Sequence, residues 1–297
     1  MAFAFARNEP VGDAIRRILI EQIDRALAQI ADAKRKPATR VHDVRKRFKE
    51  IRAVLRLVRK PLGDTFTIEN LWFRDAGRDL GTLRDAEALV EAAIELRQNV
   101  RSIGDKRLLT RVRRALAKQR DEAMQSNLDA RLANVVEQLP VAKARLANIP
   151  ALDDAFATIG DGLARTYALG RRGYRRSSIA ASAAEVHEWR KRVKDHWYHV
   201  QLLEDVWPGI MKPYAEVMST LSHALGDLHD LDVLHALAAS QPSLFGSPRS
   251  ANRLLAIIVA RREALLRVAL DIGGRVYAED PAAWRKRMRG YWRSWRR

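Results

Sequence analysis

Residues 42–49, HDVRKRFK, return 145 positions later as HEWRKRVK, residues 187–194. LGTLRD at residues 80–85 returns at the same offset as LGDLHD, residues 225–230. Two separate motifs rarely share one offset by chance, so the sequence predicts an internal duplication. We expect a first repeat of about residues 10–148 and a second of about residues 150–297, packed into a single domain that covers residues 1–297.

Apolar residues around both octapeptides recur at the spacing of an amphipathic helix. They are Val41, Val44, Phe48, Ile51, Leu55 and Val58 in the first copy, and Val186, Trp189, Val193, Val200 and Leu203 in the second. Turn-forming residues predict helix ends near residues 34–38, 61–65, 82–85, 102–105, 177–183, 207–211, 227–230 and 240–249. We therefore expect an all-α bundle with internal pseudo-symmetry, with about four helices in each half and one or two more across residues 127–147.

Positive charge is concentrated in three blocks of the chain. The sequence holds 54 Lys and Arg against 36 Asp and Glu, a formal charge of +18. Residues 34–60 carry +10, residues 165–194 carry +7 and residues 285–297 carry +7, so the remainder is mildly acidic. Clustering of this kind produces a local positive potential that attracts polyanions.

The first octapeptide belongs to a basic stripe on one face of its helix. Steps of 3, 4, 3 and 4 connect His42, Arg45, Lys49, Arg52 and Arg56, and Lys46 widens the face. The second copy supplies His187, Arg190, Lys191 and Lys194. Like charges along one face destabilise an isolated helix, so acidic neighbours, salt or a bound polyanion must neutralise them. An ordinary solvated face is the alternative interpretation.

The second motif also carries positive donors. Arg78 and Arg84 in the first half are replaced by His223 and His229 in the second, which suggests a shared role. Asp85 and Asp230 are each followed by a helical pattern, so we interpret them as N-caps. The glycines of the motif, Gly81 and Gly226, are interpreted as turn or close-packing residues.

The duplicated combination of His-x-x-Arg-Lys-x-x-Lys and Leu-Gly-x-Leu-x-Asp resembles the CHAD family, the conserved histidine α-helical domain. The basic segment YALGRRGYRR, residues 167–176, is similar to the one before the second histidine helix of that family. The resemblance extends over nearly the whole chain. It implies a helical bundle of two pseudo-symmetric four-helix units whose basic helices line a central surface or pore that binds inorganic polyphosphate.

The resemblance also implies which residues contact phosphate. Carried over by motif match, they are His42, Arg45, Lys49 and Arg52 in the first half, and His187, Arg190, Lys191, Lys194 and Tyr198 in the second. The basic pattern of the two motifs adds Lys46, Arg56, Arg78, Arg84, His223 and His229 to the expected polyphosphate-binding set. This chain departs from the family at Glu50, where a basic residue is common, and at Trp197, where arginine is common.

A CHAD domain is often preceded by a triphosphate-hydrolysing domain of the CYTH type. The Glu-x-Glu-x-Lys motif of that domain is absent from this sequence. We therefore expect a stand-alone module, and a site that binds its ligand without catalysis, cofactor or metal.

Nucleic-acid binding is the main alternative function. In the C-terminal block Trp284, Tyr291, Trp292 and Trp295 are interleaved with basic residues, as in proteins that hold single strands by base stacking. Four residues of this block, Trp284, Met288, Tyr291 and Trp295, also recur at the 4-3-4 spacing of the apolar face of a last helix, which we favour.

Catalysis is a weaker alternative. The pair His229-Asp230 resembles the metal-binding pair of phosphohydrolases, but the first repeat has Arg84-Asp85 there, and arginine does not bind metal. His196 and His199 lie one helical turn apart, a weak metal signal that partly buried polar positions explain better. We therefore expect a protein without enzymatic activity.

The compartment follows from what the sequence lacks. It has no cysteine, no apolar run near the ~20 residues of a membrane helix and no recognisable signal peptide. We expect a cytoplasmic protein without membrane contact, with polyphosphate granules as a further expected location.

Overall fold

The computed structural model describes residues 3–124 and 128–297, apart from the side chains of residues 82–84 and 123–124, and all regular secondary structure in these ranges is helical. Its helices are α1 (Val11–Ala31), α2 (Pro37–Leu57), α3 (Arg59–Leu62), α4 (Asp64–Asp79), α5 (Gly81–Asn99), α6 (Ile103–Met124), α7 (Leu128–Ala147), α8 (Phe156–Ile179), α9 (Ala183–Leu202), α10 (Pro208–Ser240), α11 (Pro248–Val276) and α12 (Pro281–Arg296). The all-α prediction is confirmed.

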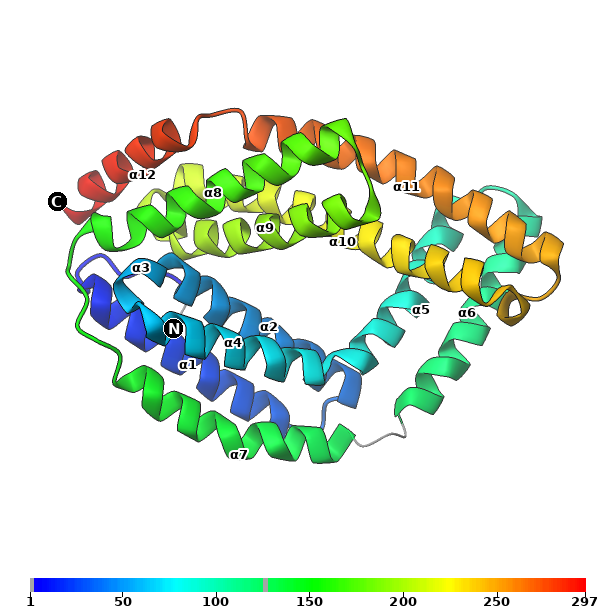
Figure 1. The fold of residues 1–297 in the computed structure, drawn as a ribbon, viewed down its shortest axis with the longest axis horizontal. Helices are drawn as coiled ribbons and strands as arrows, with labels where there is room; N and C mark the ends of the chain where they lie inside the picture. Colours follow the sequence, from blue (N-terminus) through cyan, green and yellow to red (C-terminus); the bar gives the residue numbers. More distant parts are fainter. Residues whose placement is uncertain (1–2, 125–127) are drawn as a thin grey trace.

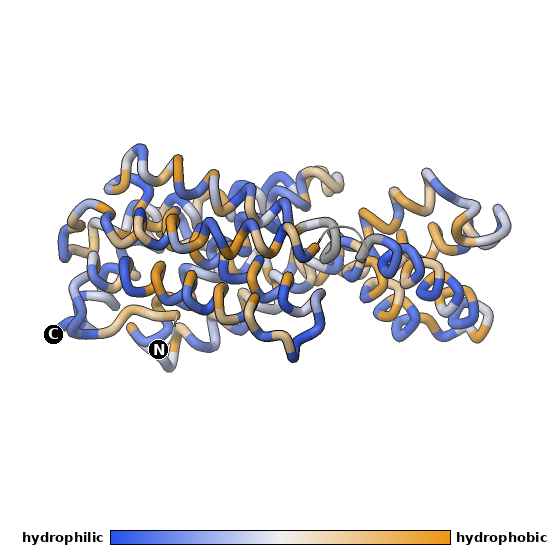
Figure 2. Tube along the Cα trace, turned by 90° about the horizontal axis from the view of Figure 1, so that it is seen from below, coloured by the Kyte–Doolittle hydropathy of each residue, from blue (hydrophilic) through white to orange (hydrophobic). Residues whose placement is uncertain are grey.

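The helices form two layers that meet along α2, α8 and α9 (Figure 1). One layer contains α1, α2, α4 and α7, and the other contains α8 to α12. Helices α5 and α6 pair with each other and extend to the far ends of α10 and α11. Seen from below in Figure 2, the molecule is elongated, with a wide lobe and a narrower one. The two motif helices of each half thus come together near the junction of the lobes.

The core is formed by the apolar stripes that the sequence predicts. All eleven stripe residues are buried, with Phe48 at 1% and Trp189 at 0% exposure. Figure 2 shows apolar and polar residues alternating around the helices, as amphipathic packing requires. This burial confirms the predicted faces of α2 and α9.

The two layers approach each other closely at a backbone contact of α8 with α2. A Cβ atom on Gly162 would lie 1.9 Å from the carbonyl oxygen of Leu57. Only a residue without a side chain allows the helices to cross at this distance. The charged pair across the same layers, Arg56 Nη1 and Asp195 Oδ1, is 2.9 Å apart.

Two predicted helix ends are wrong. Helix α10 runs without interruption through residues 227–230, and in the first half the break lies at Leu80 rather than at residues 82–85. Asp85 and Asp230 therefore lie inside helices and are not N-caps. Local turn signals at a glycine are weak, and tertiary packing overrides them here. The internal duplication remains a prediction from the sequence.

The last helix is part of the core. Trp284, Met288 and Trp292 are buried, while Tyr291 and Trp295 are half-buried and pack against the core. The predicted apolar face of Trp284, Met288, Tyr291 and Trp295 is thus confirmed, and Trp292, which that prediction did not include, is buried as well. None of the helices within the described ranges has the length and apolarity that crossing a membrane requires.

Candidate functional site

A groove of about 730 Å³ lies between the four helices that carry the repeated motifs. Helices α2 and α9 supply basic residues to it, and α5 and α10 supply acidic residues and histidines. The predicted site residues that line it are His42, Arg45, Lys46, Lys49, His187, Arg190, Lys194, Tyr198, His223 and His229. The fold thus brings together two basic segments that are 145 residues apart in sequence.

Four other predicted residues are not among the groove lining. Arg52 donates from Nε to Asn70 Oδ1 over 3.2 Å, and burial, with the nearby Arg56, lowers its pKa to about 10. Arg56 is held by Asp195 between the layers. Lys191 donates to Glu188 Oε1 over 2.5 Å, and Arg78 is largely exposed beside Asp75. The side chain of Arg84, also predicted, lies outside the described residues.

The two glycines of the second motif pack against the two arginines of the first. A Cβ atom on Gly81 would lie 2.7 Å from Nη1 of Arg45, and one on Gly226 would lie 3.8 Å from Nε of Arg190. The close-packing interpretation therefore has a specific cause at Gly81, which leaves room for Arg45, whereas Gly226 makes only an ordinary contact with Arg190. The second contact is looser than the first.

This difference predicts that Gly81→Ala lowers the affinity of the groove for a polyanion about fivefold, or about 1 kcal/mol, because the new methyl group displaces the Arg45 guanidinium. The free energy of unfolding should change little, since the flexible side chain of Arg45 can move away from the added methyl group. Gly226→Ala is the matched control and should leave affinity unchanged, because 3.8 Å is an ordinary contact. Titration of both variants with polyphosphate would refute the assignment if they behave alike.

The wall formed by α9 has a partly desolvated lysine. Lys194 Nζ lies 4.0 Å from the centre of the Trp197 ring and 5.4 Å from that of Tyr198. Burial, with Arg190 and Lys46 nearby, lowers the pKa of Lys194 to about 8. A bound anion would oppose both effects and favour the charged form of this lysine.

Two histidines form a pair at the end of the groove. Nδ1 of His187 and Nδ1 of His229 are 3.2 Å apart. Burial, with Arg190 nearby, lowers the pKa of His229 to about 4, and burial also lowers the pKa of His187. His223 instead accepts or donates locally at Ser219 on its own helix. The lowered pKa values favour the neutral form of both His187 and His229.

Acidic residues on α5 and α10 are the feature that the sequence reasoning missed. Among the described side chains, the groove lining includes as many carboxylates as Lys and Arg residues: Asp85, Glu91, Glu95, Asp227 and Asp230. Glu95 is bound by Arg261 from α11, and Asp85 lies 3.9 Å from Arg45. The spacing of Glu91 and Glu95, one turn apart after the second motif, was the available signal.

The acidic wall has a consequence for the basic one. Its carboxylates lower the net positive charge of the groove when no ligand is bound, as at Asp85, whose Oδ1 lies 3.9 Å from Nη2 of Arg45. The pKa of Asp227 is raised by burial and by the nearby carboxylate of Glu95. An anion would have to compete with these carboxylates for the basic side chains.

The histidines of the first motif do not lie at helix N-termini. Helix α2 begins at Pro37 and α9 at Ala183, so His42 and His187 lie in the second turn. The unpaired backbone N–H groups of each helix precede them. Side chains rather than backbone donors therefore form this site.

The structure offers no support for a metal centre in the described ranges. No group of three or more potential metal-ligating side chains is found there. His196 and His199 are fully buried, where His199 Nε2 lies 2.8 Å from Ala53 O and His196 Nδ1 lies 3.4 Å from the Tyr277 hydroxyl. Both histidines are packed inside the core, whereas the sequence predicted only partly buried positions.

Comparison with known proteins identifies the fold. A family model described as the CHAD domain matches residues 17–239. The crystal structure of the CHAD domain from the plant Ricinus communis superposes with a TM-score of 0.65 at 17% identity, over 94% of this chain and 95% of that one. No curated protein matches the chain.

Proposed function

Because the chain belongs to the CHAD domain family, we propose that its groove binds inorganic polyphosphate. The observation that carries the proposal is the meeting of the two basic segments on α2 and α9 at one groove. Binding takes place without catalysis, and the polymer is held as a ligand. A cytoplasmic location, including polyphosphate granules, is part of the proposal.

The length of the basic segments favours a chain over a single anion. From His42 to Lys49, and from His187 to Lys194, each segment extends about 10 Å along its helix axis. Arg45 and Arg190 are suited to forked donation to phosphate oxygens, and Lys46, Lys49 and Lys194 supply point charges. A polymer with repeated phosphates engages all of them at once, which a small anion does not.

Charge neutralisation then supplies most of the affinity. Each phosphate that a basic side chain neutralises releases a cation from the counterion atmosphere of the polymer, so affinity falls as salt rises. The part of the affinity that survives at physiological salt measures how well the groove matches the spacing of the ligand.

Nucleic acid is the alternative ligand, and the aromatic residues argue against it as the preferred one. Base stacking needs accessible rings. Trp284 and Trp292 are buried in the core, and within the groove Trp197 stacks on Tyr198 and lies under Lys194. We therefore expect nucleic acid to compete only weakly.

The test is a competition between long-chain polyphosphate, single-stranded DNA, duplex DNA and RNA, repeated from low to physiological salt. We expect polyphosphate to bind at least tenfold more tightly than the nucleic acids, with all ligand concentrations expressed as phosphate, and to retain affinity at physiological salt. Equal affinities that collapse together with salt would replace the proposal with a generic basic surface.

The same groove predicts a pH dependence. A bound polyanion raises the pKa of Lys194 above about 8 and that of His229 above about 4, so the complex holds more protons than the free protein. Affinity should therefore fall as pH rises through 8 and increase as pH falls below about 6.5, by at most about tenfold per pH unit for each proton.

Titrations between pH 5 and 9 test this dependence. Lys194→Met should flatten the upper part of the profile, and His229→Gln the lower part. The second variant also distinguishes protonation of His229 from protonation of Asp227, whose pKa is raised. Protonation of Asp227 would increase affinity at low pH in the same direction, but that effect would persist in His229→Gln. A wild-type affinity that is constant over the range would contradict the placement of the anion beside these groups.

A further inference from the structure

A second concentration of positive charge lies where α12 packs against the beginning of α8 (Figure 1). A pocket of about 1130 Å³ opens there, and we call it the α12 pocket. Seven of its fourteen lining residues are Lys or Arg, and one, Asp154, is acidic. The groove, by contrast, has equal numbers of carboxylates and Lys or Arg residues among the described side chains of its lining, which exclude that of Arg84. The α12 pocket thus has the larger uncompensated charge.

The helix presents these charges because its other face is core. Trp284, Met288 and Trp292 point into the bundle. The basic residues Arg285, Arg289, Arg293 and Arg296 follow at steps of 4, 4 and 3 on the adjoining face, and all four line the pocket. They extend over about 16 Å of helix, which suits several phosphates in a row.

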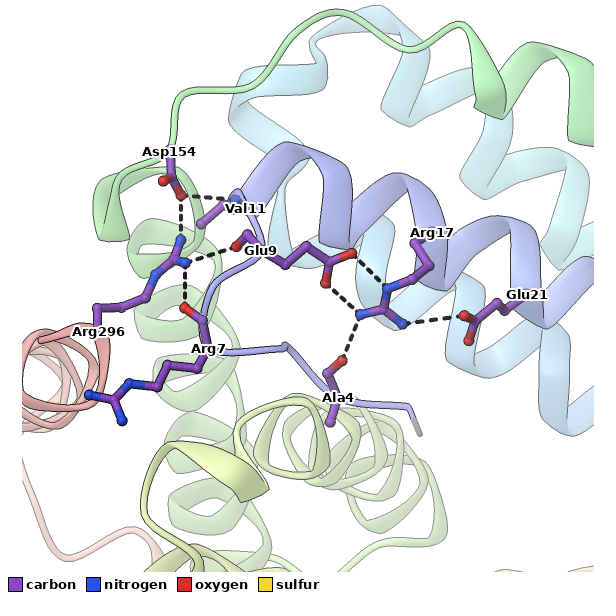
Figure 3. Close-up of polar contacts among 8 residues, drawn as sticks. All are labelled: Ala4, Arg7, Glu9, Val11, Arg17, Glu21, Asp154 and Arg296. Carbon is purple, nitrogen blue, oxygen red and sulfur yellow. Dashed lines mark hydrogen bonds and ion pairs between the residues drawn. The ribbon is translucent and has the colours of Figure 1, made fainter. Parts of the chain in front are cut away.

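The acidic residues near the pocket already have partners. Asp154 Oδ1 accepts from the backbone N–H of Val11 and from Arg296. Glu9 turns its carboxylate to Arg17, with both contacts at 2.7 Å (Figure 3). Neither carboxylate is therefore available to the exposed cations of the pocket.

Arg296 makes contacts that connect the two ends of the chain. Its guanidinium donates to the carbonyl oxygens of Arg7 and Glu9 at 2.7 and 2.9 Å and so ties the N-terminal segment to α12. Figure 3 shows the side chain of Arg7 directed away from these contacts. The segment that brings Arg7 to the pocket is thus held in place before any ligand binds.

The remaining cations lack comparable partners. Within the described ranges, the ion pairs of the pocket cations are those of Arg296 with Asp154 and of Arg285 with Asp161. Lys286, Arg289 and Arg293 are exposed to solvent. Mutual repulsion of like charges on adjacent turns is relieved by a bound anion.

The chemistry of the pocket selects phosphate rather than bases. Its tryptophan, Trp292, is 5% exposed and packs edge-on against Phe5, so its ring offers no stacking surface. The first turn of α8 borders the pocket, and no side chain caps it, which adds backbone donors to the charged ones.

We propose that the α12 pocket is a second anion-binding site, separate from the groove, which takes the phosphates of a short inorganic phosphate chain. All seven cations lie outside residues 17–239, the part of the chain that the family model matches. The assignment rests on local charge and does not depend on the ligand of the groove.

Calorimetric titration of the full chain with tripolyphosphate tests the site, because this probe is too short to bridge both places. We expect two sites in the wild type. The variant Arg289→Glu/Arg293→Glu should lose one, with at least a tenfold loss of affinity there, and should melt at an unchanged temperature because both side chains are exposed.

The matched control is Arg107→Glu/Arg111→Glu, which makes the same charge change at the same spacing on exposed positions of α6. It should retain both sites. Retention of both sites by the α12 variant, or an equal loss in the control, would overturn the proposal. So would a short oligothymidine that binds the α12 pocket more tightly than tripolyphosphate.

A groove variant separates this proposal from the proposed function. Arg45→Glu/Lys49→Glu should keep the α12 site intact. If the groove binds no phosphate chain, the wild type shows a single site that only the α12 variant removes. If the α12 pocket binds none, the single site is lost in the groove variant alone.

Discussion

Reversing the charge of Arg45 and Lys49 together is expected to weaken the binding of long-chain polyphosphate by at least about a hundredfold, or about 2.7 kcal/mol. Both side chains line the groove on α2. Each substitution removes a contact to phosphate and adds a carboxylate to a groove that already has five. The slope of affinity against salt should also become shallower, because fewer counterions are released.

Titrations at several salt concentrations measure both effects, and circular dichroism should show an unchanged helical signal. The control is again Arg107→Glu/Arg111→Glu on α6, outside the groove lining. The double variant Arg45→Gln/Lys49→Gln, which adds no negative charge, should show a smaller loss of affinity. It controls for repulsion between the introduced glutamates and nearby carboxylates such as Asp85. Wild-type affinity in both groove variants would show that the basic stripe on α2 is not the site.

Replacing Gly162 by alanine is expected to destabilise the protein by about 3 kcal/mol, a large part of the 5–15 kcal/mol that typical domains possess. The added methyl group would lie 1.9 Å from the carbonyl oxygen of Leu57 and 2.7 Å from its Cα. Backbone atoms cannot rotate away as a side chain can, so α8 must move away from α2. Urea unfolding should show a lower midpoint.

Gly290 provides the opposite control within α12. A Cβ atom there meets nothing within 4 Å, and the position is helical and exposed. Gly290→Ala should therefore stabilise the protein, by about 0.4–1 kcal/mol, through the lower entropy of the unfolded chain. If both alanine variants shift the midpoint equally, the close crossing of α2 and α8 is not the cause.

The sequence predicted best where a pattern is local. The apolar faces of α2 and α9 follow from helical periodicity alone, and all their members are buried. The same periodicity placed Arg52 and Arg56 on one face with His42, Arg45 and Lys49, but it ignores what packs above each turn. Further along α2 the other layer covers that face, so Arg56 binds Asp195.

The acidic wall illustrates what lies beyond a local pattern. Glu95 and Asp227 approach each other from α5 and α10, which are more than a hundred residues apart. No spacing within either helix predicts that meeting. In the same way, the continuous course of α10 through Gly226 depends on its neighbours, since a glycine alone favours a turn.

The amino-acid sequence by itself determined the helical class, the buried faces, the family and the two basic segments, because these depend on the order of residues within one or two helices. The tertiary structure decided which of the charges share a groove and which are neutralised. Coulomb interactions depend on distances in space and on burial, which only the packing of distant helices establishes. The pairing of Arg45 with Gly81, the histidine pair and the α12 pocket all arise at this level.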